Sequence, residues 1–344
     1  MKICIVSEEL AAPLDEGFKK FSWSLMKALS AQHRVLVMSK RGLFEEGYRV
    51  ERVRMNRLLL NWGLWRRIRR FAPEIICYVP SSSGTFNSFL RARILKWYRT
   101  KARVILISLQ PRNYSPLQTR WIPRLRPDVV LVQSHQSAKA LEELGCSAHV
   151  LPSGVELDRF TPVSESQKIQ LRQQYDMPSD DFLVLHVGHI KASRRVSIFK
   201  ELQAEPGIQG LLVGSTSTPQ DEELILELKN AGIRIIRDYI PNIQEIYQLS
   251  DCYLFQVSSK KAAIELPLSV LEAMACNLPV IATRYGGLAD FFQEDDGLLF
   301  AESPGEILDK ISLVKEGWPS RTRAMVESFS WENVLKTYWQ DYLR

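Results

Sequence analysis

Short apolar runs rich in β-branched residues alternate along the chain with segments of helical periodicity. This alternation is typical of parallel β-sheets covered by helices, because one parallel strand can follow another only after a crossover, which is usually a helix. The runs predict strands at residues 3–6, 35–38, 75–79, 104–107, 129–132, 148–151, 182–187, 210–213, 233–236, 252–255 and 279–282. The pattern therefore predicts an α/β fold.

The chain is long enough for two domains. Its length of 344 residues exceeds that of a typical domain with a single hydrophobic core. The strand pattern restarts after residues 152–162, a stretch that contains Gly and Pro and suits a linker. We expect an N-terminal domain at 1–160 and a C-terminal domain at 161–325. The remaining residues, 326–344, contain apolar side chains at helical spacing and predict a last helix that packs back on the body.

Three features favour a cytoplasmic protein. No segment is long and apolar enough to span a bilayer. The first apolar run stops at Ser7, Glu8 and Glu9 without a small-residue cleavage site, so we expect a buried strand there and not a secretion signal. The five cysteines are an odd number without any C-x-x-C pair, which favours a reducing compartment.

Charge is distributed unevenly between the two halves. Residues 1–160 contain 27 basic and 13 acidic side chains, whereas residues 161–344 contain 18 basic and 26 acidic ones. The first half thus carries a net charge of +14 and the second −8. The basic half predicts contact with something anionic. We do not expect a nucleic acid there, because the arginines lack the interleaved motifs of known nucleic-acid-binding modules.

Two segments carry a family resemblance. Residues 151–162 have the sequence LPSGVELDRFTP, and residues 268–283 have LSVLEAMACNLPVIAT, followed by Gly286 and Gly287. In this order they resemble two motifs of the family 4 retaining glycosyltransferases, and weaker similarity extends over nearly the whole chain. The resemblance implies the GT-B fold, in which two Rossmann-like domains with parallel sheets face a central cleft. It also implies that the C-terminal domain holds the nucleotide-sugar donor and the N-terminal domain the acceptor.

The resemblance implies a mechanism as well. In this family a hexose moves from a nucleotide sugar to an acceptor, and the leaving diphosphate itself is thought to help deprotonate the acceptor hydroxyl. The protein then contributes mainly positioning and electrostatic stabilisation. We expect no cofactor besides the donor substrate, and the absence of an Asp-x-Asp motif predicts that no metal ion is required.

The second segment predicts a helix at residues 268–276, with Pro267 in its first turn. The unpaired N–H groups and the partial positive charge of a helix N-terminus suit a nucleotide diphosphate, so we expect Leu268 and Ser269 to contact the donor. The resemblance gives Glu272 the role of binding the ribose hydroxyls. The alternative is a glutamate on the exposed face of an amphipathic helix.

A second loop resembles the family's phosphate-binding loop. Residues 187–196, with the sequence VGHIKASRRV, place His189 where the family has an Arg and Arg194 where it has a Lys. Arg194 keeps a cation that can bind a phosphate bidentately. His189 is either a weaker phosphate partner or an ordinary loop histidine. Gly188 and Tyr239 complete the donor-binding residues expected in this half.

The expected reaction centre departs from the family pattern. The chain has Gln110, on the acceptor side, where the family has a His, and Ile264 where it has a Glu. Glu265 is displaced from that position by one residue, and it either takes the place of the missing carboxylate or faces water. We expect Glu265, Arg194 and His189 to be the catalytic residues. Gly17 matches one glycine of a family loop that approaches the donor, but it also suits a plain turn.

These departures keep two other functions open. The first is a GT-B pseudoenzyme that binds a nucleotide sugar without transferring it, either alone or as the partner of an active subunit. The second is a nucleotide-sugar 2-epimerase, an isomerase of similar architecture, although the segment around Glu272 favours the transferase.

Residues 56–71 predict an amphipathic helix in the basic half. At 100° per residue its apolar side chains cover an arc about 200° wide, opposite Arg66, Arg67 and Arg70. The arc either packs on the N-terminal sheet or, with its two tryptophans, lies in the interface of an anionic membrane. Several members of the resembled family glycosylate lipid-linked acceptors. We therefore expect peripheral association with the inner face of the membrane, and an acceptor that is a lipid or a lipid-carried glycan.

Overall fold

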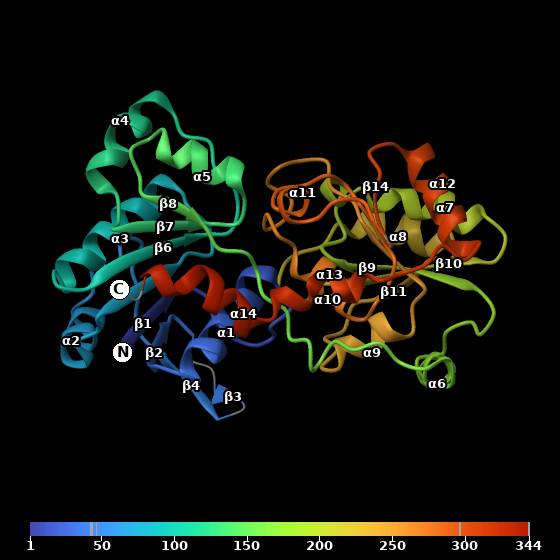
Figure 1. The fold of residues 1–344 in the computed structure, drawn as a ribbon, viewed down its shortest axis with the longest axis horizontal. Helices are drawn as coiled ribbons and strands as arrows, with labels where there is room; N and C mark the ends of the chain where they lie inside the picture. The colour runs from blue at the N-terminus through green and yellow to red at the C-terminus, as the bar shows by residue number, and fades with distance from the viewer. Residues whose placement is uncertain (42–43, 46, 296, 343–344) are drawn as a thin grey trace. The chain divides into compact units, whose positions relative to one another are not determined.

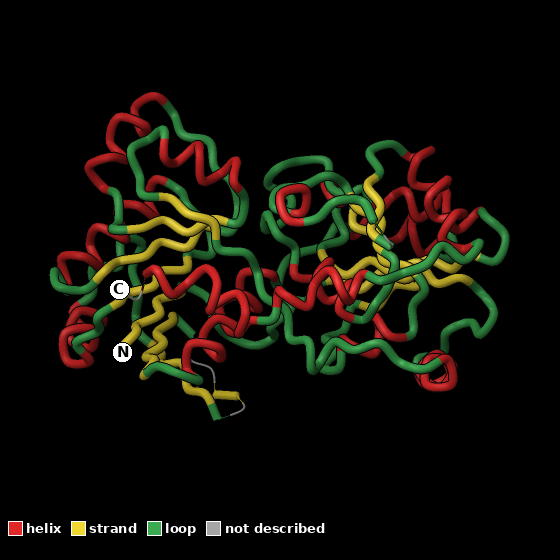
Figure 2. The backbone as a smooth tube through the Cα atoms, viewed as in Figure 1, coloured by secondary structure: helices red, strands yellow, loops and turns green. Residues whose placement is uncertain are grey.

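The computed structural model describes residues 1–344 apart from 42–43, 46, 296 and 343–344. The chain forms two units, each with its own sheet (Figures 1 and 2). We call them the N-terminal unit, which consists of Met1–Ser153, Ala263–Leu266 and Trp331–Arg344, and the C-terminal unit, which consists of Gly154–Ala262 and Pro267–Ser330. Residues 263–266 thus belong to the N-terminal unit, although they lie far along the chain.

Seven parallel strands form most of the N-terminal sheet, in the order β4-β2-β1-β5-β6-β7-β8, and the short β3 pairs antiparallel with β4 at its edge. The bounds are β1 (Lys2–Ser7), β2 (Arg34–Ser39), β3 (Phe44–Glu45), β4 (Tyr48–Arg52), β5 (Ile75–Val79), β6 (Arg103–Ser108), β7 (Val129–Val132) and β8 (Ala148–Val150). All six strands predicted in this half are confirmed. The sequence pattern missed β3 and β4, because an edge strand such as YRVER buries only Val50.

Helices cover both faces of this sheet (Figure 1). They are α1 (Gly17–Ser30), α2 (Trp62–Phe71), α3 (Phe86–Tyr98), α4 (Pro116–Leu125) and α5 (His135–Glu142). The last four share one hydrophobic core with the side chains on one face of the strands. The alternation along β1 explains this, because Cys4 and Val6 face that core while the equally buried Ile3 and Ile5 face the other side.

Helix α2 is shorter than the amphipathic segment predicted around it. It begins at Trp62, where the Asn61 side chain caps it by accepting a hydrogen bond from the Leu64 N–H, and so the apolar residues before it lie on a loop. Leu64 and Ile68 are fully buried in the core of the sheet. The packing of α2 on the sheet is therefore confirmed, but it uses only part of the apolar arc.

The C-terminal sheet has six parallel strands in the order β11-β10-β9-β12-β13-β14. Their bounds are β9 (Phe182–Gly188), β10 (Ile208–Gly214), β11 (Arg234–Ile236), β12 (Cys252–Phe255), β13 (Val280–Ala282) and β14 (Leu298–Phe300). The helices are α6 (Glu165–Gln174), α7 (Phe199–Ala204), α8 (Glu222–Asn230), α9 (Ile243–Gln248), α10 (Leu268–Ala275), α11 (Leu288–Phe291), α12 (Pro304–Lys315) and α13 (Thr322–Val326). The five strands predicted here are confirmed, and only the three-residue β14 was missed.

The chain ends in a helical segment that returns to the N-terminal unit. It consists of α14 (Trp331–Val334), a π-helical turn (Leu335–Trp339) and a 3₁₀ turn (Gln340–Tyr342). Trp331 packs edge-on against Phe21 of α1, with the ring centroids 5.3 Å apart. In the described part of the chain, no helix is long and apolar enough to cross a membrane.

Candidate active site

Open parallel sheets bind ligands at the carboxyl ends of their strands. In the C-terminal sheet, the central strand β9 ends there. The strand ends at Gly188, whose φ of +152° is rarely adopted by a residue with a side chain. A Cβ atom at this position would lie 3.4 Å from His186 Nε2 and 3.9 Å from Arg194 Nη2. The glycine therefore lets the backbone pass close to the Arg194 guanidinium.

Arg194 is a half-buried cation that has no acidic partner among the residues that the structure describes. It ends a 3₁₀ turn, Ala192–Arg194, and its guanidinium carbon lies 5.4 Å from the centre of the Phe255 ring. Burial lowers the pKa of Arg194, and the groups that oppose this are the phenols of Tyr253 and Tyr285, which are uncharged at neutral pH. In the described part of the chain its Nε has no hydrogen-bond partner. Such a charge is unfavourable in the free protein unless a bound anion compensates it.

His186 lies beneath the same loop and stays uncharged. Its Nδ1 donates to the Leu254 carbonyl at 3.2 Å, and the side chain is 1% exposed. Burial lowers the pKa of His186 to about 3, and the charge of Arg194 lowers it further. His186 therefore adds no positive charge at neutral pH, and Arg194 is the cation beside Gly188.

Tyr253, on β12, connects the end of β9 with the start of α10. Its hydroxyl donates to the Val187 carbonyl at 3.2 Å and accepts a hydrogen bond from the side chain of Ser269 in the first turn of α10. Burial raises the pKa of Tyr253 well above its usual range. Tyr253 thus links Arg194, Gly188 and the N-terminus of α10 at the carboxyl ends of the strands of the C-terminal sheet.

The N-terminus of α10 is arranged as the sequence predicts, apart from one position. Pro267 is the N-cap and not a first-turn residue, and no side chain caps the helix. The first N–H groups of the helix, at Leu268 and Ser269, therefore have no side-chain acceptor from the cap, which leaves them suited to an anion. Leu268 itself is buried at 7% exposure.

Glu272 lies one turn further along α10 and is only 4% exposed. Its Oε2 accepts a hydrogen bond from the Tyr247 hydroxyl at 2.9 Å. The alternative of a glutamate on an exposed helix face is therefore wrong. The role of Glu272 in binding ribose stays a prediction, now with a fixed carboxylate to carry it.

His189 and Tyr239 lie differently from these residues. The Nε2 of His189 is 3.0 Å from the hydroxyl of Thr218, which favours a loop histidine that orders the segment after β10. Tyr239 follows β11, the strand at the edge of the sheet, and is 45% exposed. Both are still candidates for contact with the donor, but neither is joined to Arg194 by a hydrogen bond in the described residues.

Glu265 belongs to the N-terminal unit and is 3% exposed. Its Oε1 accepts hydrogen bonds from the hydroxyls of Ser134 and Ser137, at 2.6 and 2.7 Å, where Ser134 is the N-cap of α5. Its backbone N–H donates to the Leu109 carbonyl at 2.8 Å. The alternative in which Glu265 faces water is therefore wrong. The carboxylate holds residues 263–266 at the start of α5, where a helix N-terminus favours a negative charge.

We expect replacement of Glu265 by alanine to lower the free energy of unfolding by about 1–3 kcal/mol, because it leaves buried hydroxyl groups without their acceptor. Glu265→Gln retains an oxygen acceptor and should cost less. Urea unfolding of both variants measures this, with Glu143→Ala, at an exposed glutamate of the same unit, as the control. Equal stability of Glu265→Ala and the wild type would contradict the anchoring role.

The other two predicted residues of the N-terminal unit have structural partners. A Cβ atom on Gly17, the first residue of α1, would lie 3.2 Å from Ile264 Cδ1, so the glycine admits the segment 263–266. The turn alternative is wrong, because Gly17 lies in the first turn of α1. Gln110 follows β6, and its Oε1 accepts a hydrogen bond from Arg112 Nη2 at 2.9 Å. Neither observation tests a role with donor or acceptor.

Sequence reasoning missed Tyr247, Tyr253 and His186 as parts of this site. Aromatic residues inside a strand or a helix are usually core, and these three are indeed buried. Their polar atoms become informative only when the tertiary structure shows what they contact. In the described residues there is no group of His, Cys, Asp and Glu side chains that could hold a metal ion.

The comparisons with known proteins agree with this geometry. Residues 167–328, which contain Arg194 and Glu272, match the family model of glycosyl transferases group 1. The chain carries a glycosyl transferases group 1 domain. The match begins close to the start of α6 and ends at the last residues of the C-terminal unit.

Two curated relatives illustrate the sequence similarity. The sulfoquinovosyl transferase SQD2 of Arabidopsis thaliana is 27% identical over 224 residues, 62% of this chain and 42% of the relative. A D-inositol 3-phosphate glycosyltransferase of Mycolicibacterium smegmatis is 27% identical over 210 residues, 57% of this chain and 47% of the relative. The chain thus matches less than half the length of these relatives.

Solved structures match over the whole chain. HepE of Anabaena in complex with UDP-glucose has a TM-score of 0.78 at 16% identity, covering 100% of this chain and 99% of that one. Sucrose-phosphate synthase of Thermosynechococcus elongatus has a TM-score of 0.77 at 16% identity, covering 100% and 98%. The predicted fold class is therefore confirmed: the chain has the GT-B fold, with two Rossmann-like units.

Proposed function

We propose that the chain is a retaining glycosyltransferase of the hexosyltransferase type, which moves a sugar from a nucleotide-sugar donor to a glycan or lipid-linked acceptor. The observation that carries this proposal is the half-buried Arg194 guanidinium, whose buried Nε has no hydrogen-bond partner among the described residues. A donor diphosphate supplies the missing negative charge. The HepE complex with UDP-glucose supports a nucleotide sugar as the ligand of this fold.

The proposed mechanism depends on the leaving group. Arg194 and the first N–H groups of α10 stabilise the charge that develops on the departing diphosphate, while Glu272 holds the ribose. The diphosphate helps to deprotonate the acceptor hydroxyl on the same face of the sugar. The proposal needs neither a nucleophilic side chain nor a metal ion, since binding, orientation and electrostatic stabilisation supply the rate enhancement.

We also propose an acceptor carried on a lipid, and peripheral association of the enzyme with an anionic membrane. The net charge of +14 in the first 160 residues supports this, because an anionic surface attracts a basic one. A structural neighbour of 13% identity, WaaG, is described as a glycosyltransferase involved in lipopolysaccharide biosynthesis, which is consistent with a lipid acceptor on this fold.

Thermal unfolding in the presence of a panel of nucleotide sugars tests the donor. A ligand that binds only the folded chain raises its stability by RT ln(1 + [L]/Kd), about 2.7 kcal/mol at 100 times the dissociation constant. The panel includes uridine, guanosine and adenosine diphosphate sugars, because a neighbour of this fold, starch synthase IV, is described as bound to ADP. No stabilisation by any donor would contradict the proposal.

A non-catalytic nucleotide-sugar-binding protein is the second candidate. Glu265, the candidate for the missing carboxylate of the reaction centre, favours it. The Glu265 carboxylate accepts hydrogen bonds from Ser134 and Ser137, which gives it a structural role. Slow hydrolysis of the stabilising donor distinguishes the two. A transferase without acceptor releases free sugar at a measurable rate, whereas the non-catalytic protein does not.

A further inference from the structure

A loop before α2, residues 56–61, presents two leucines to solvent. Leu58 and Leu60 are 37% and 50% exposed, whereas Leu59 between them is 1% exposed. Leu59 has a φ of +61°, a left-handed conformation that is unfavourable for a residue with a side chain. The backbone is thus strained in a way that turns one leucine inward and holds its two neighbours outward.

The loop is rigid, because Asn56 bonds to it from within. Asn56 Oδ1 accepts hydrogen bonds from the N–H groups of Leu58 and Leu60, at 3.1 and 2.8 Å, and its Nδ2 donates to the Leu60 carbonyl at 2.6 Å. Three hydrogen bonds from one side chain fix the backbone on both sides of Leu59. The exposed leucines therefore do not result from a disordered loop.

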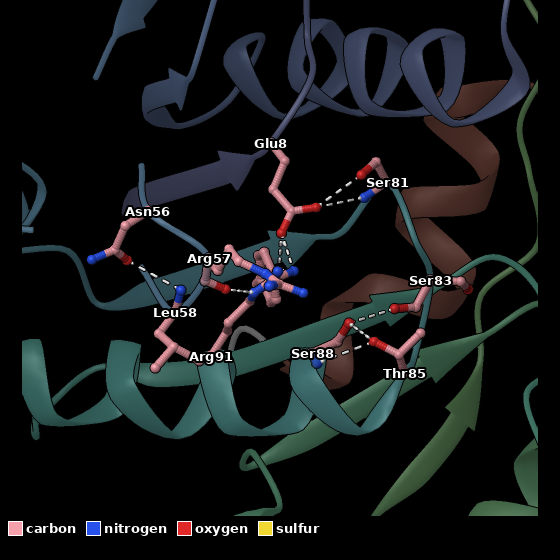
Figure 3. Close-up of polar contacts among 10 residues, drawn as sticks. Glu8, Asn56, Arg57, Leu58, Ser81, Ser83, Thr85, Ser88 and Arg91 are labelled. Atoms are coloured by element: carbon pink, nitrogen blue, oxygen red, sulfur yellow. Dashed lines mark hydrogen bonds and ion pairs between the residues drawn. The ribbon is translucent and has the colours of Figure 1, made fainter. Parts of the chain in front are cut away.

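Helix α3 holds the same loop from outside. Arg91 Nε donates to the Arg57 carbonyl at 2.6 Å, and the hydroxyl of Tyr98 donates to the Leu59 carbonyl at 2.6 Å. Arg91 is in turn ion-paired with the buried Glu8, so the anchor extends to the end of β1 (Figure 3). A buried ion pair and several hydrogen bonds thus hold a loop that exposes Leu58 and Leu60.

Two tryptophans extend this exposed apolar surface. The N–H of Asn61 donates to the hydroxyl of Tyr98 at 3.0 Å, so the start of α2 at Trp62 lies close to the end of α3, where Trp97 precedes Tyr98. They are 70% and 61% exposed, and Trp62 stacks on Trp65 with the ring centroids 4.3 Å apart. We call Leu58, Leu60, Trp62, Trp65 and Trp97 the leucine–tryptophan face.

The segment of chain that contains the face is strongly basic. Residues 52–127 contain 17 lysines and arginines and a single acid, Glu74. On α2, Arg66, Arg69 and Arg70 are exposed, and Arg69 lies 5.0 Å from the centre of the Trp65 ring. This is the combination of apolar tip, interfacial aromatics and cations that binds an anionic bilayer.

We propose that the leucine–tryptophan face inserts into the headgroup region of an anionic membrane, with the surrounding arginines on the lipid phosphates. A nucleic acid is the weaker partner, because bases stack on tryptophans but gain nothing from two leucines held outward. Burial of those leucines in acyl chains, by contrast, is directly favourable. The inference deepens the proposed membrane association by naming the residues that make it.

Co-sedimentation with vesicles tests the proposal. We would compare phosphatidylcholine vesicles with vesicles that also contain phosphatidylglycerol, at low and high salt. The variant is Leu58→Ser with Leu60→Ser, and the matched control is Leu226→Ser with Leu313→Ser, at two leucines of the C-terminal unit that are 61% and 36% exposed. Nucleotide-sugar binding by every protein is measured in parallel by thermal shift.

We expect the wild type to sediment with anionic vesicles at low salt and to be released at high salt. The Leu58, Leu60 variant should partition about tenfold or more weakly, while the control binds as the wild type does. A wild type that stays in the supernatant, a leucine variant that binds normally, or displacement of the vesicles by polyuridylate would each overturn the proposal. Vesicle binding without nucleotide-sugar binding would instead overturn the proposed transferase and leave the face intact.

Discussion

Replacing Arg194 with methionine is expected to lower sugar transfer by about 100-fold, the range seen when one donor to a developing anion is removed. Methionine keeps most of the volume and removes the charge. Because the half-buried guanidinium lies beside Phe255 and the described residues offer it no acidic partner, the same change should leave the free protein as stable as the wild type, or more so. Transfer kinetics and thermal unfolding without ligand measure the two effects.

Arg195→Ala is the matched control for Arg194. Arg195 lies next to it in sequence, but its Nη1 donates to the Glu302 carbonyl at 2.8 Å on the surface of the unit. We expect little loss of transfer in this variant. If the two variants lose transfer equally, the phosphate contact does not belong to Arg194. If Arg194→Met unfolds the free protein, the cation is structural.

Replacing Glu272 with alanine is expected to weaken nucleotide-sugar binding by about 1.5–3 kcal/mol, roughly 10- to 150-fold, because a buried charged acceptor for the ribose hydroxyls is lost. Calorimetric titration with the donor found in the thermal-shift panel measures the change. Glu272→Gln keeps an oxygen that can accept from Tyr247 and should bind with intermediate affinity.

Tyr247→Phe distinguishes a ribose role from a purely structural one. The phenol of Tyr247 donates to Glu272, and removing it leaves the carboxylate in place. If Glu272 binds ribose, Tyr247→Phe should affect donor affinity less than Glu272→Ala does. If donor affinity is unchanged in a folded Glu272→Ala variant, the carboxylate serves only its tyrosine partner.

The membrane proposal and the donor proposal rest on different parts of the molecule. The donor residues lie in the C-terminal unit, and the leucine–tryptophan face lies in the N-terminal unit. The measurements can therefore succeed or fail separately. If both proposals are confirmed, the chain is an enzyme that takes its donor from solution and its acceptor from a membrane.

The sequence alone determined eleven of the fourteen strands and the charge asymmetry. Parallel strands that are buried on both faces appear as near-continuous apolar runs, so β5, β7 and β12 have the bounds that their runs predict. The helix at Leu268 was also predictable, because Pro267 marks its start whatever the rest of the chain does. Local chemistry is sufficient for such elements.

Only the tertiary structure decided what the polar side chains contact. Glu265 is hydrogen-bonded to Ser134, 131 residues earlier in the chain, and no local pattern predicts an acceptor at that separation. Likewise Leu58 and Leu60 belong to an apolar arc in sequence but lie on a loop, because the Asn61 cap starts α2 after them and α3 holds the loop from outside. Periodicity specifies which residues are apolar, whereas burial and hydrogen bonding depend on neighbours that only the folded chain brings together.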